Sequence, residues 1–367
     1  MHLLPLHTAQ ISTELELAYI DSWADRAKED LPQRYLTLVG LHGVGFNSAI
    51  WNPLIPSLPS DVRFLAYNQR SYTGSSPAFP AKAPGGTDAT AQYLVDLMEF
   101  ANWAVKQLEL PEVDGEGQGG VVLLSWSKGT VLPISLLSLL HHTPSPSSPA
   151  SDNTYLAHLP PSGLPHTSLL TSHLRALLLF EPPGSAFGRP ATKDYHDAMS
   201  SVSPPNSSTA SEFAAAFAGW IGGYSPLPPP AAEAEAEAEL AETLAPSNLE
   251  SFDADLVDAG WQPLCVAHGF AWTLASTASA IEALGKQALA PGLSPAIPVG
   301  LIYGARTNGY FLETAGMIEE WWGVRGGGER MRKTASRRID ATNHFAFVHR
   351  PQEFARAVME LVQELSE

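Results

Sequence analysis

A serine flanked by small residues lies where a buried strand is predicted to pass directly into a helix. Residues 121–130 read VVLLSWSKGT, with Ser127 placed two positions after Ser125 and two before Gly129. Such a turn strains the backbone of the serine and projects its hydroxyl, and close packing of strand and helix requires small neighbours. A serine becomes a strong nucleophile only when a base accepts its proton and N–H donors stabilise the oxyanion. The pattern therefore predicts a base and an oxyanion site elsewhere in the chain.

Three further motifs occur in an order that fits this chemistry. His42-Gly43-Val44-Gly45 follows an apolar run, residues 68–75 read NQRSYTGS, and residues 339–345 read IDATNHF just before the last predicted helix. Together with the serine motif they resemble the α/β-hydrolase family, with its nucleophile elbow, its oxyanion loop after the third strand, its turn after the fourth strand and its late catalytic histidine. The resemblance covers about residues 14–141, 176–183 and 298–366.

The resemblance implies a role for each matched residue. Ser127 would be the nucleophile and His344 the base, while the main-chain N–H groups of Val44 and Lys128 would form the oxyanion hole. Ser125 stands where a glycine is commoner in the family. The turn motif differs from the family pattern at Asn68, Ser71 and Thr73.

The acidic member of the triad departs from the commonest family pattern. Most members carry it after the strand that corresponds to residues 299–303, but residues 304–309 here read GARTNG, and Asn308 cannot supply a charge. A minority, including some haloalkane dehalogenases and the fungal zearalenone-type lactone hydrolases, carries a glutamate after the preceding strand. Glu181, which follows residues 176–180, is similar in placement and is our prediction. Asp340 is the alternative, although it lies only four residues before His344.

Other motifs in the sequence are typical of different chemistry, but the motifs or elements that should accompany them are missing. Ser125 and Lys128 form a Ser-x-x-Lys pattern and residues 151–153 read SDN, as in penicillin-recognising enzymes, yet the Lys-Thr-Gly motif is absent. Residues 115–120 read GEGQGG but precede a strand, whereas a dinucleotide loop follows one. The sequence contains neither a Gly-Lys-Ser/Thr phosphate loop nor a His-Glu-x-x-His motif. We therefore expect no cofactor and no metal.

Short apolar runs alternate with helical patterns along the chain. This alternation predicts an α/β fold, with a mostly parallel sheet covered by helices on both faces. Strands are expected at 14–19, 35–41, 62–67, 121–124, 176–180 and 299–303, and helices at 90–108, 130–140, 314–322 and 351–365. The predicted organisation is a first part of the core at 1–182 with a Pro/Ser-rich loop at 142–166, an inserted helical cap at 183–293 and a second part of the core at 294–367.

Composition restricts the partners. The 367 residues carry 21 Lys and Arg against 38 Asp and Glu, a formal charge of −17, which opposes binding to nucleic acid or anionic membranes. Cys265 is the single cysteine, so an internal disulfide is excluded. No run of about 18 apolar residues is present and the first residues do not resemble a signal peptide, so we expect a cytoplasmic protein. The oligomeric state stays open, with a homodimer among the alternatives.

These observations predict a serine hydrolase that cleaves a carboxylic ester or lactone of a hydrophobic small molecule. Trp126 and Trp220 are expected to contact the substrate, and Trp220 belongs to an aromatic stripe in the cap that could equally be core. A peptidase or a carbon–carbon bond hydrolase is compatible with the same motifs. Two alternatives from other classes are a catalytically silent member that only binds a small molecule, and a scaffold that uses the acidic run near residues 231–243.

Overall fold

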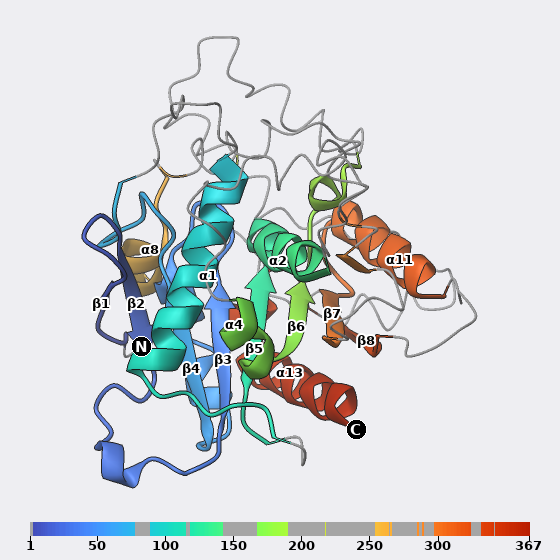
Figure 1. Ribbon diagram of the computed structural model, residues 1–367. Coiled ribbons are helices and arrows are strands. Elements are labelled where there is room, and N and C mark those ends of the chain that lie inside the picture. Colours follow the sequence, from blue (N-terminus) through green and yellow to red (C-terminus); the bar gives the residue numbers. More distant parts are fainter. Residues whose placement is uncertain are drawn as a thin grey trace, which may run out of the picture.

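An eight-stranded sheet forms the centre of the protein (Figure 1). This computed structural model describes residues 3–77, 89–114, 118–141, 167–189, 254–263, 297–323, 332–340 and 342–367, together with residues 217, 265, 285, 288 and 289. The strands are β1 (His7–Gln10), β2 (Glu16–Asp21), β3 (Leu36–Leu41), β4 (Val62–Tyr67), β5 (Val121–Trp126), β6 (Leu174–Phe180), β7 (Val299–Gly304) and β8 (Thr334–Ile339).

The strand order places β3 and β5 at the middle of the sheet. The order is β1-β2-β4-β3-β5-β6-β7-β8, in which β2 runs antiparallel to both of its neighbours and all pairs from β4 to β8 are parallel. Strands β3, β5 and β6 are almost entirely buried, as expected for parallel strands covered on both faces. Loops that follow the parallel strands therefore emerge at one common edge.

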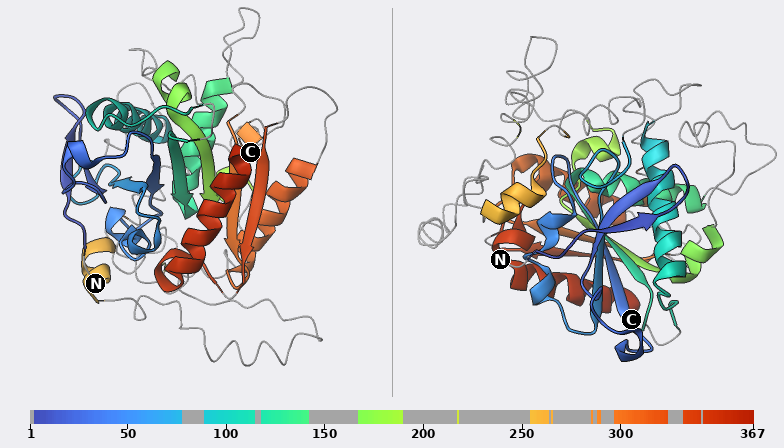
Figure 2. Two further views of the ribbon diagram at one scale, coloured as in Figure 1. Left: turned by 90° about the horizontal axis from the view of Figure 1, so that it is seen from below. Right: turned by 90° about the vertical axis from the view of Figure 1, so that its left-hand side faces the viewer.

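Helices cover both faces of the sheet (Figure 2). Successive residues of β5 alternate between the two layers: Leu123 packs with the helices of one face, whereas Val122 and Leu124 pack with those of the other. The first face carries α1 (Ala89–Gln107), α2 (Val131–His141), α4 (Thr167–His173) and α11 (Gly309–Gly323). The second face carries α8 (Ala254–Gly260), α12 (Ala346–His349) and α13 (Pro351–Ser366).

The predicted strands and helices are confirmed, with differences at their ends. The strand expected at 14–19 is β2, which starts and ends two residues later because Ile20 and Asp21 still pair with β4. The helix expected at 314–322 begins at Gly309, since the Asn308 side chain caps its first turn by accepting a hydrogen bond from Tyr310 N at 3.0 Å. The sequence analysis did not predict β1 at all.

Most of the segments expected to be insertions lie outside the described residues. The predicted loop at 142–166 is wholly outside them, and the predicted cap at 183–293 is described only at 183–189, at 254–263 and at a few single residues. The described piece containing α8 contacts the loop after β3: Asn47 N donates to Gly260 O at 2.9 Å, and Gln262 N donates to Gly45 O at 2.7 Å. Among the described helices, none is both long and apolar enough to cross a membrane.

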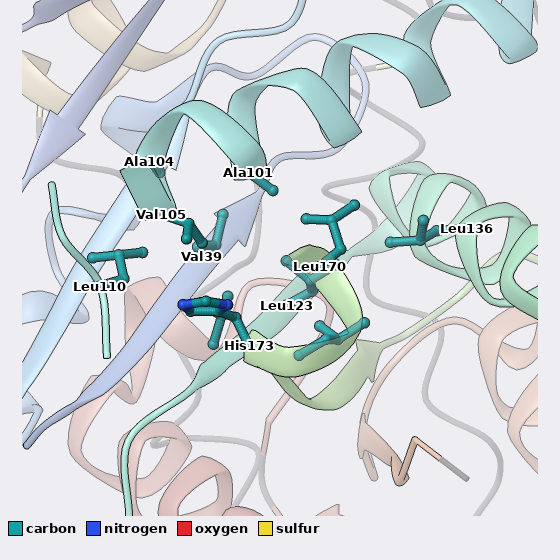
Figure 3. Close-up of a pocket in the computed structure, with 11 residues that line it drawn as sticks. Val39, Ala101, Ala104, Val105, Leu110, Leu123, Leu136, Leu170 and His173 are labelled. Carbon is teal, nitrogen blue, oxygen red and sulfur yellow. The ribbon is translucent and has the colours of Figure 1, made fainter. Parts of the chain in front are cut away.

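A small internal cavity of about 20 Å³ lies between α1, α2, α4 and the sheet (Figure 3). Its wall is aliphatic except for His173, and Leu123 of β5 points into it. A space of this size could hold at most about one water molecule, and an aliphatic wall offers that water almost no hydrogen-bond partners. The packing of this layer therefore depends on the large aliphatic side chains around the cavity.

We predict that Leu123→Ala lowers the free energy of unfolding by about 3 to 5 kcal/mol, because it removes a buried side chain and enlarges an existing cavity. Leu6→Ala is the matched control: Leu6 is 45% exposed, and its loss should cost less than about 0.5 kcal/mol. Urea denaturation of both variants measures the difference. Equal costs would contradict the described core.

Candidate active site

Five loops meet at the carboxyl edge of the parallel strands. They follow β3, β5, β6, β7 and β8 and carry, respectively, His42, Ser127, Glu181, Thr307 and His344. In open α/β sheets this edge is the usual place for a site, because it gathers residues that are far apart in the sequence. The five loops therefore define the candidate active site.

Ser127 occupies the turn between β5 and α2 in the strained conformation that the motif predicts. Its φ is 54°, in the left-handed region, and a short 3₁₀ helix, Ser127–Thr130, leads into α2. A Cβ on Gly129 would lie 2.6 Å from His42 O, so only glycine fits there. A Cβ on Gly43 would lie 3.1 Å from the Cβ of Ser127. The turn and the loop after β3 are thus in direct contact.

His344 and Glu181 form a buried pair although 163 residues separate them. The His344 Nδ1 lies 2.6 Å from the Glu181 Oε2, and their side chains are only 4% and 0% exposed. His344 Nε2 is also buried and has no hydrogen-bond partner among the described residues. With a carboxylate at Nδ1, the neutral imidazole carries its proton there and keeps Nε2 as an acceptor. This is the arrangement that a general base requires.

Two more donors, one from the last residue of β7 and one from the loop that follows, bind the Glu181 carboxylate. Gly304 N donates to Oε1 at 2.8 Å, and Thr307 Oγ1 donates to Oε2 at 2.6 Å. Glu181 itself has a left-handed φ of 46°, at the point where β6 ends. The sequence analysis missed both donors. The sequence does contain a signal for Thr307: the loop that lacks the expected carboxylate carries a hydroxyl residue instead.

Aromatic rings surround the imidazole of His344. The Phe311 ring stacks on it with centroids 4.2 Å apart and an interplanar angle of 17°, and the Trp126 ring lies 5.1 Å away. Trp126 directly precedes Ser127 in the chain, so the nucleophile turn and the histidine are close in space. Phe311 was not predicted, because it lies before residue 314, where the helix was expected to begin.

The loop after β3 is held by a set of internal hydrogen bonds. His42 Nε2 accepts from Gln69 N at 3.1 Å, and its Nδ1 lies 2.9 Å from Gly43 O, which fixes a neutral tautomer with the proton on Nδ1. Burial lowers the pKa of His42 to about 4. Gly45 N donates to the Tyr72 hydroxyl at 3.1 Å. These bonds fix the main chain on both sides of Val44.

Val44 and Lys128, the two residues expected to supply oxyanion donors, are both buried at this edge. Within the described part of the chain, no hydrogen bond leaves the main-chain N–H of Val44. Lys128 directly follows Ser127, and burial lowers the pKa of its ammonium group well below the usual range.

A second hollow lies at the opposite edge of the sheet. This cleft of about 420 Å³ is lined by the ends of β2 and α1 and the start of β4. Four of the charged groups that line it form pairs: Arg63 with Asp21 at 2.6 Å, and Lys28 with Glu109 at 2.5 Å. Among the described residues no group of three or more His, Cys, Asp or Glu side chains could hold a metal ion.

Solved structures with the same chain topology come from several enzymes. A hydrolase from Pseudomonas aeruginosa superposes with a TM-score of 0.54 at 18% identity, covering 97% of this chain and 98% of its own. A bromoperoxidase from Bacillus anthracis gives 0.52 at 13% identity, covering 98% and 100%. A variant of the haloalkane dehalogenase DatA from Agrobacterium tumefaciens gives 0.54 at 14% identity, covering 99% and 98%.

The chain has the α/β-hydrolase fold. No protein-family model and no curated protein sequence matches it. At identities below one in five, the likeness concerns the arrangement of the chain, and the chemistry has to be argued from the residues of the site.

The remaining predicted residues occupy different places in the α/β-hydrolase fold. Asp340, the alternative acid, is 86% exposed at its side chain and pairs with Arg338 at 3.3 Å, whereas Glu181 contacts His344. Trp126 is buried beside the histidine. Trp220 lies outside the described residues, so its expected contact with substrate stays a prediction.

We predict that Gly304→Ala lowers the free energy of unfolding by about 1 to 3 kcal/mol, because its Cβ would lie 2.4 Å from Thr342 O, in the loop that carries His344. Gly316→Ala is the matched control. No atom lies within 4 Å of its added Cβ in α11, so it should raise the stability by about 0.5 to 1 kcal/mol. Thermal or urea unfolding gives both values, and a neutral Gly304→Ala would show that the loops are not in contact.

We predict that His42 stays neutral in the folded protein until the pH falls to about 4, since burial depresses its pKa from 6.5. The unfolded chain binds this proton first, so His42 destabilises the fold progressively from about pH 6.5 down to about pH 4, by about 3 kcal/mol at most. Imidazole ¹⁵N NMR titration, assigned with His42→Gln, measures the pKa. A midpoint near 6.5 would contradict the buried neutral tautomer.

Proposed function

We propose that this protein is a serine hydrolase that cleaves a carboxylic ester or lactone of a hydrophobic small molecule through an acyl-enzyme on Ser127. One observation carries the proposal: His344 contacts the buried Glu181 carboxylate through Nδ1, and its Nε2 has no hydrogen-bond partner among the described residues, at the sheet edge where Ser127 follows β5. A histidine held in this way can take the proton of a serine and return it.

The first half of the reaction forms the acyl-enzyme. Ser127 Oγ attacks the carbonyl carbon while His344 Nε2 takes the hydroxyl proton, and the Glu181 carboxylate balances the charge of the resulting imidazolium. The main-chain N–H groups of Val44 and Lys128 stabilise the oxyanion. When the tetrahedral intermediate collapses, the C–O bond to the alcohol breaks and the imidazolium gives its proton to the leaving oxygen.

Water completes the cycle. His344 takes a proton from water as the water oxygen attacks the acyl carbon, and the proton returns to Ser127 Oγ when the ester bond to the serine breaks. The products of an ester are a carboxylic acid and an alcohol. In a lactone the alcohol stays attached to the acyl group, so the product is one hydroxy acid.

The residue type at the nucleophile position favours acyl transfer over dehalogenation. A carboxylate nucleophile that displaces a halide gives an ester, which water can cleave. A serine that did the same would give an alkyl ether, which this machinery could not hydrolyse. Ser127 therefore supports a carbonyl substrate, although one of the structures with the same fold is a haloalkane dehalogenase.

A catalytically silent binding protein is the main competing function. The loop after β7 carries no carboxylate, which on its own would favour loss of catalysis. Glu181, at the end of the neighbouring strand β6, supplies a carboxylate to His344 Nδ1 instead. This contact favours an enzyme over a silent binding protein. The rings of Phe311 and Trp126 beside the imidazole support a hydrophobic substrate.

We predict that a fluorophosphonate adds once to the parent protein and not to Ser127→Ala, because only an activated serine reacts with this reagent. Ser135→Ala is the matched control, a buried serine in the helix that follows Ser127, and it should react like the parent. Intact mass of each treated protein measures the adduct, beside turnover of a short and a bulky aryl ester.

An adduct that persists in Ser127→Ala would place the reactive group elsewhere. A folded parent that gives neither an adduct nor ester or lactone turnover would contradict the proposed function and favour the silent binding protein.

A further inference from the structure

Thr307 shares one oxygen atom of Glu181 with the candidate base. Its hydroxyl donates to Oε2 at 2.6 Å, the same oxygen that lies 2.6 Å from His344 Nδ1. Thr307 is 1% exposed, so water does not compete for this hydroxyl. A side chain from the loop after β7 thus binds the acid that β6 supplies.

We propose that Thr307 is a positioning residue that holds the Glu181 carboxylate in line with His344. Its effect on turnover rests on the proposed function, whereas its effect on the contact between Glu181 and His344 does not. The hydroxyl of Thr307 donates to the Glu181 carboxylate, so it acts on His344 through that carboxylate.

The carboxylate needs such a support because of how Glu181 enters the site. Glutamate has one more rotatable bond than aspartate, and here it extends from a left-handed backbone position at the end of a strand. Gly304 N fixes Oε1 at 2.8 Å, and apart from His344 itself no other described donor than Thr307 holds the second oxygen. The hydroxyl of Thr307 fixes the second oxygen.

The burial of the Glu181 carboxylate is a second reason why it needs the hydrogen bond from Thr307. Glu181 is fully buried, and the oxygen atoms of a buried carboxylate need hydrogen-bond donors that replace their lost hydration. Gly304, Thr307 and His344 are the described donors to it; Gly304 is the last residue of β7, and Thr307 lies in the loop that follows. The loop after β7 therefore supplies hydrogen bonds where the commoner family pattern would supply the charge itself.

The loop has the rigidity that a positioning role demands. Arg306 N donates to Thr342 O at 2.8 Å, and Thr342 Oγ1 donates to Ile339 O at 2.9 Å, so the neighbour of Thr307 is tied to the loop that carries His344. On the other side, α11 begins directly after Asn308, which caps it. Thr307 is thus fixed relative to both members of the pair.

The test compares three variants of the full chain. Thr307→Val keeps the shape and removes the hydroxyl, Thr307→Ser keeps the hydroxyl, and Thr314→Val is the matched control. Thr314 is also buried, and its hydroxyl donates to Tyr310 O within its own helix at 2.9 Å. Two readouts are taken: the far-downfield proton NMR resonance of the His344 Nδ1–H, and kcat and KM for an aryl ester.

We expect Thr307→Val to lose or shift the Nδ1–H resonance and to lower kcat about tenfold to a hundredfold with little change in KM, as for other residues that orient a catalytic group. Thr307→Ser and Thr314→Val should resemble the parent in both readouts. An unchanged resonance and kcat in Thr307→Val, or equal losses in Thr314→Val, would overturn the proposal.

The two proposals can fail separately. If the parent hydrolyses no ester or lactone but the resonance is lost only in Thr307→Val, the proposed function is wrong and the positioning role stands. If the parent is active and Thr307→Val is indistinguishable from it, the hydrolase stands and the positioning role is wrong.

Discussion

The candidate site depends on one interaction, the hydrogen-bonded pair of Glu181 and His344. A carboxylate with no solvent exposure is costly to bury, and hydrogen bonds to a charged group return about 1.5 to 3 kcal/mol each. Glu181 receives such bonds from a main-chain N–H, a hydroxyl and an imidazole. These donors come from the end of β7, the loop after it and the loop after β8, so the hydrogen bonds to Glu181 also align the ends of three strands.

The sheet explains how such distant residues meet. Parallel strands in the order β5-β6-β7-β8 bring Ser127, Glu181, Thr307 and His344 to successive positions along one edge. Backbone strain is concentrated at the same edge, since Ser127 and Glu181 both have a left-handed φ at the residue after their strands. Strain of this kind persists only where the surrounding packing holds it, and it often marks residues that must project from a strand end.

Sequence predicted the fold and the chain order of the candidate residues, because buried strands and the small residues around Ser127 leave local patterns. It predicted Glu181 at the end of β6, and the structure brings that residue into contact with His344. Thr307 and Phe311 were not predicted, since their contacts join loops and helices that are far apart in the chain. The strand β1 was missed because four residues, two of them exposed, leave too short a pattern.

The most direct test of this account is the rate at which a fluorophosphonate labels Ser127 in Glu181→Gln and in Asp340→Asn. Each variant replaces one carboxylate by its amide, and the two sites differ in that Glu181 contacts His344 whereas Asp340 pairs with Arg338 at the surface. The account predicts that Glu181→Gln slows labelling by about 10³-fold to 10⁴-fold, while Asp340→Asn reacts like the parent. Rapid labelling of a folded Glu181→Gln variant would contradict it.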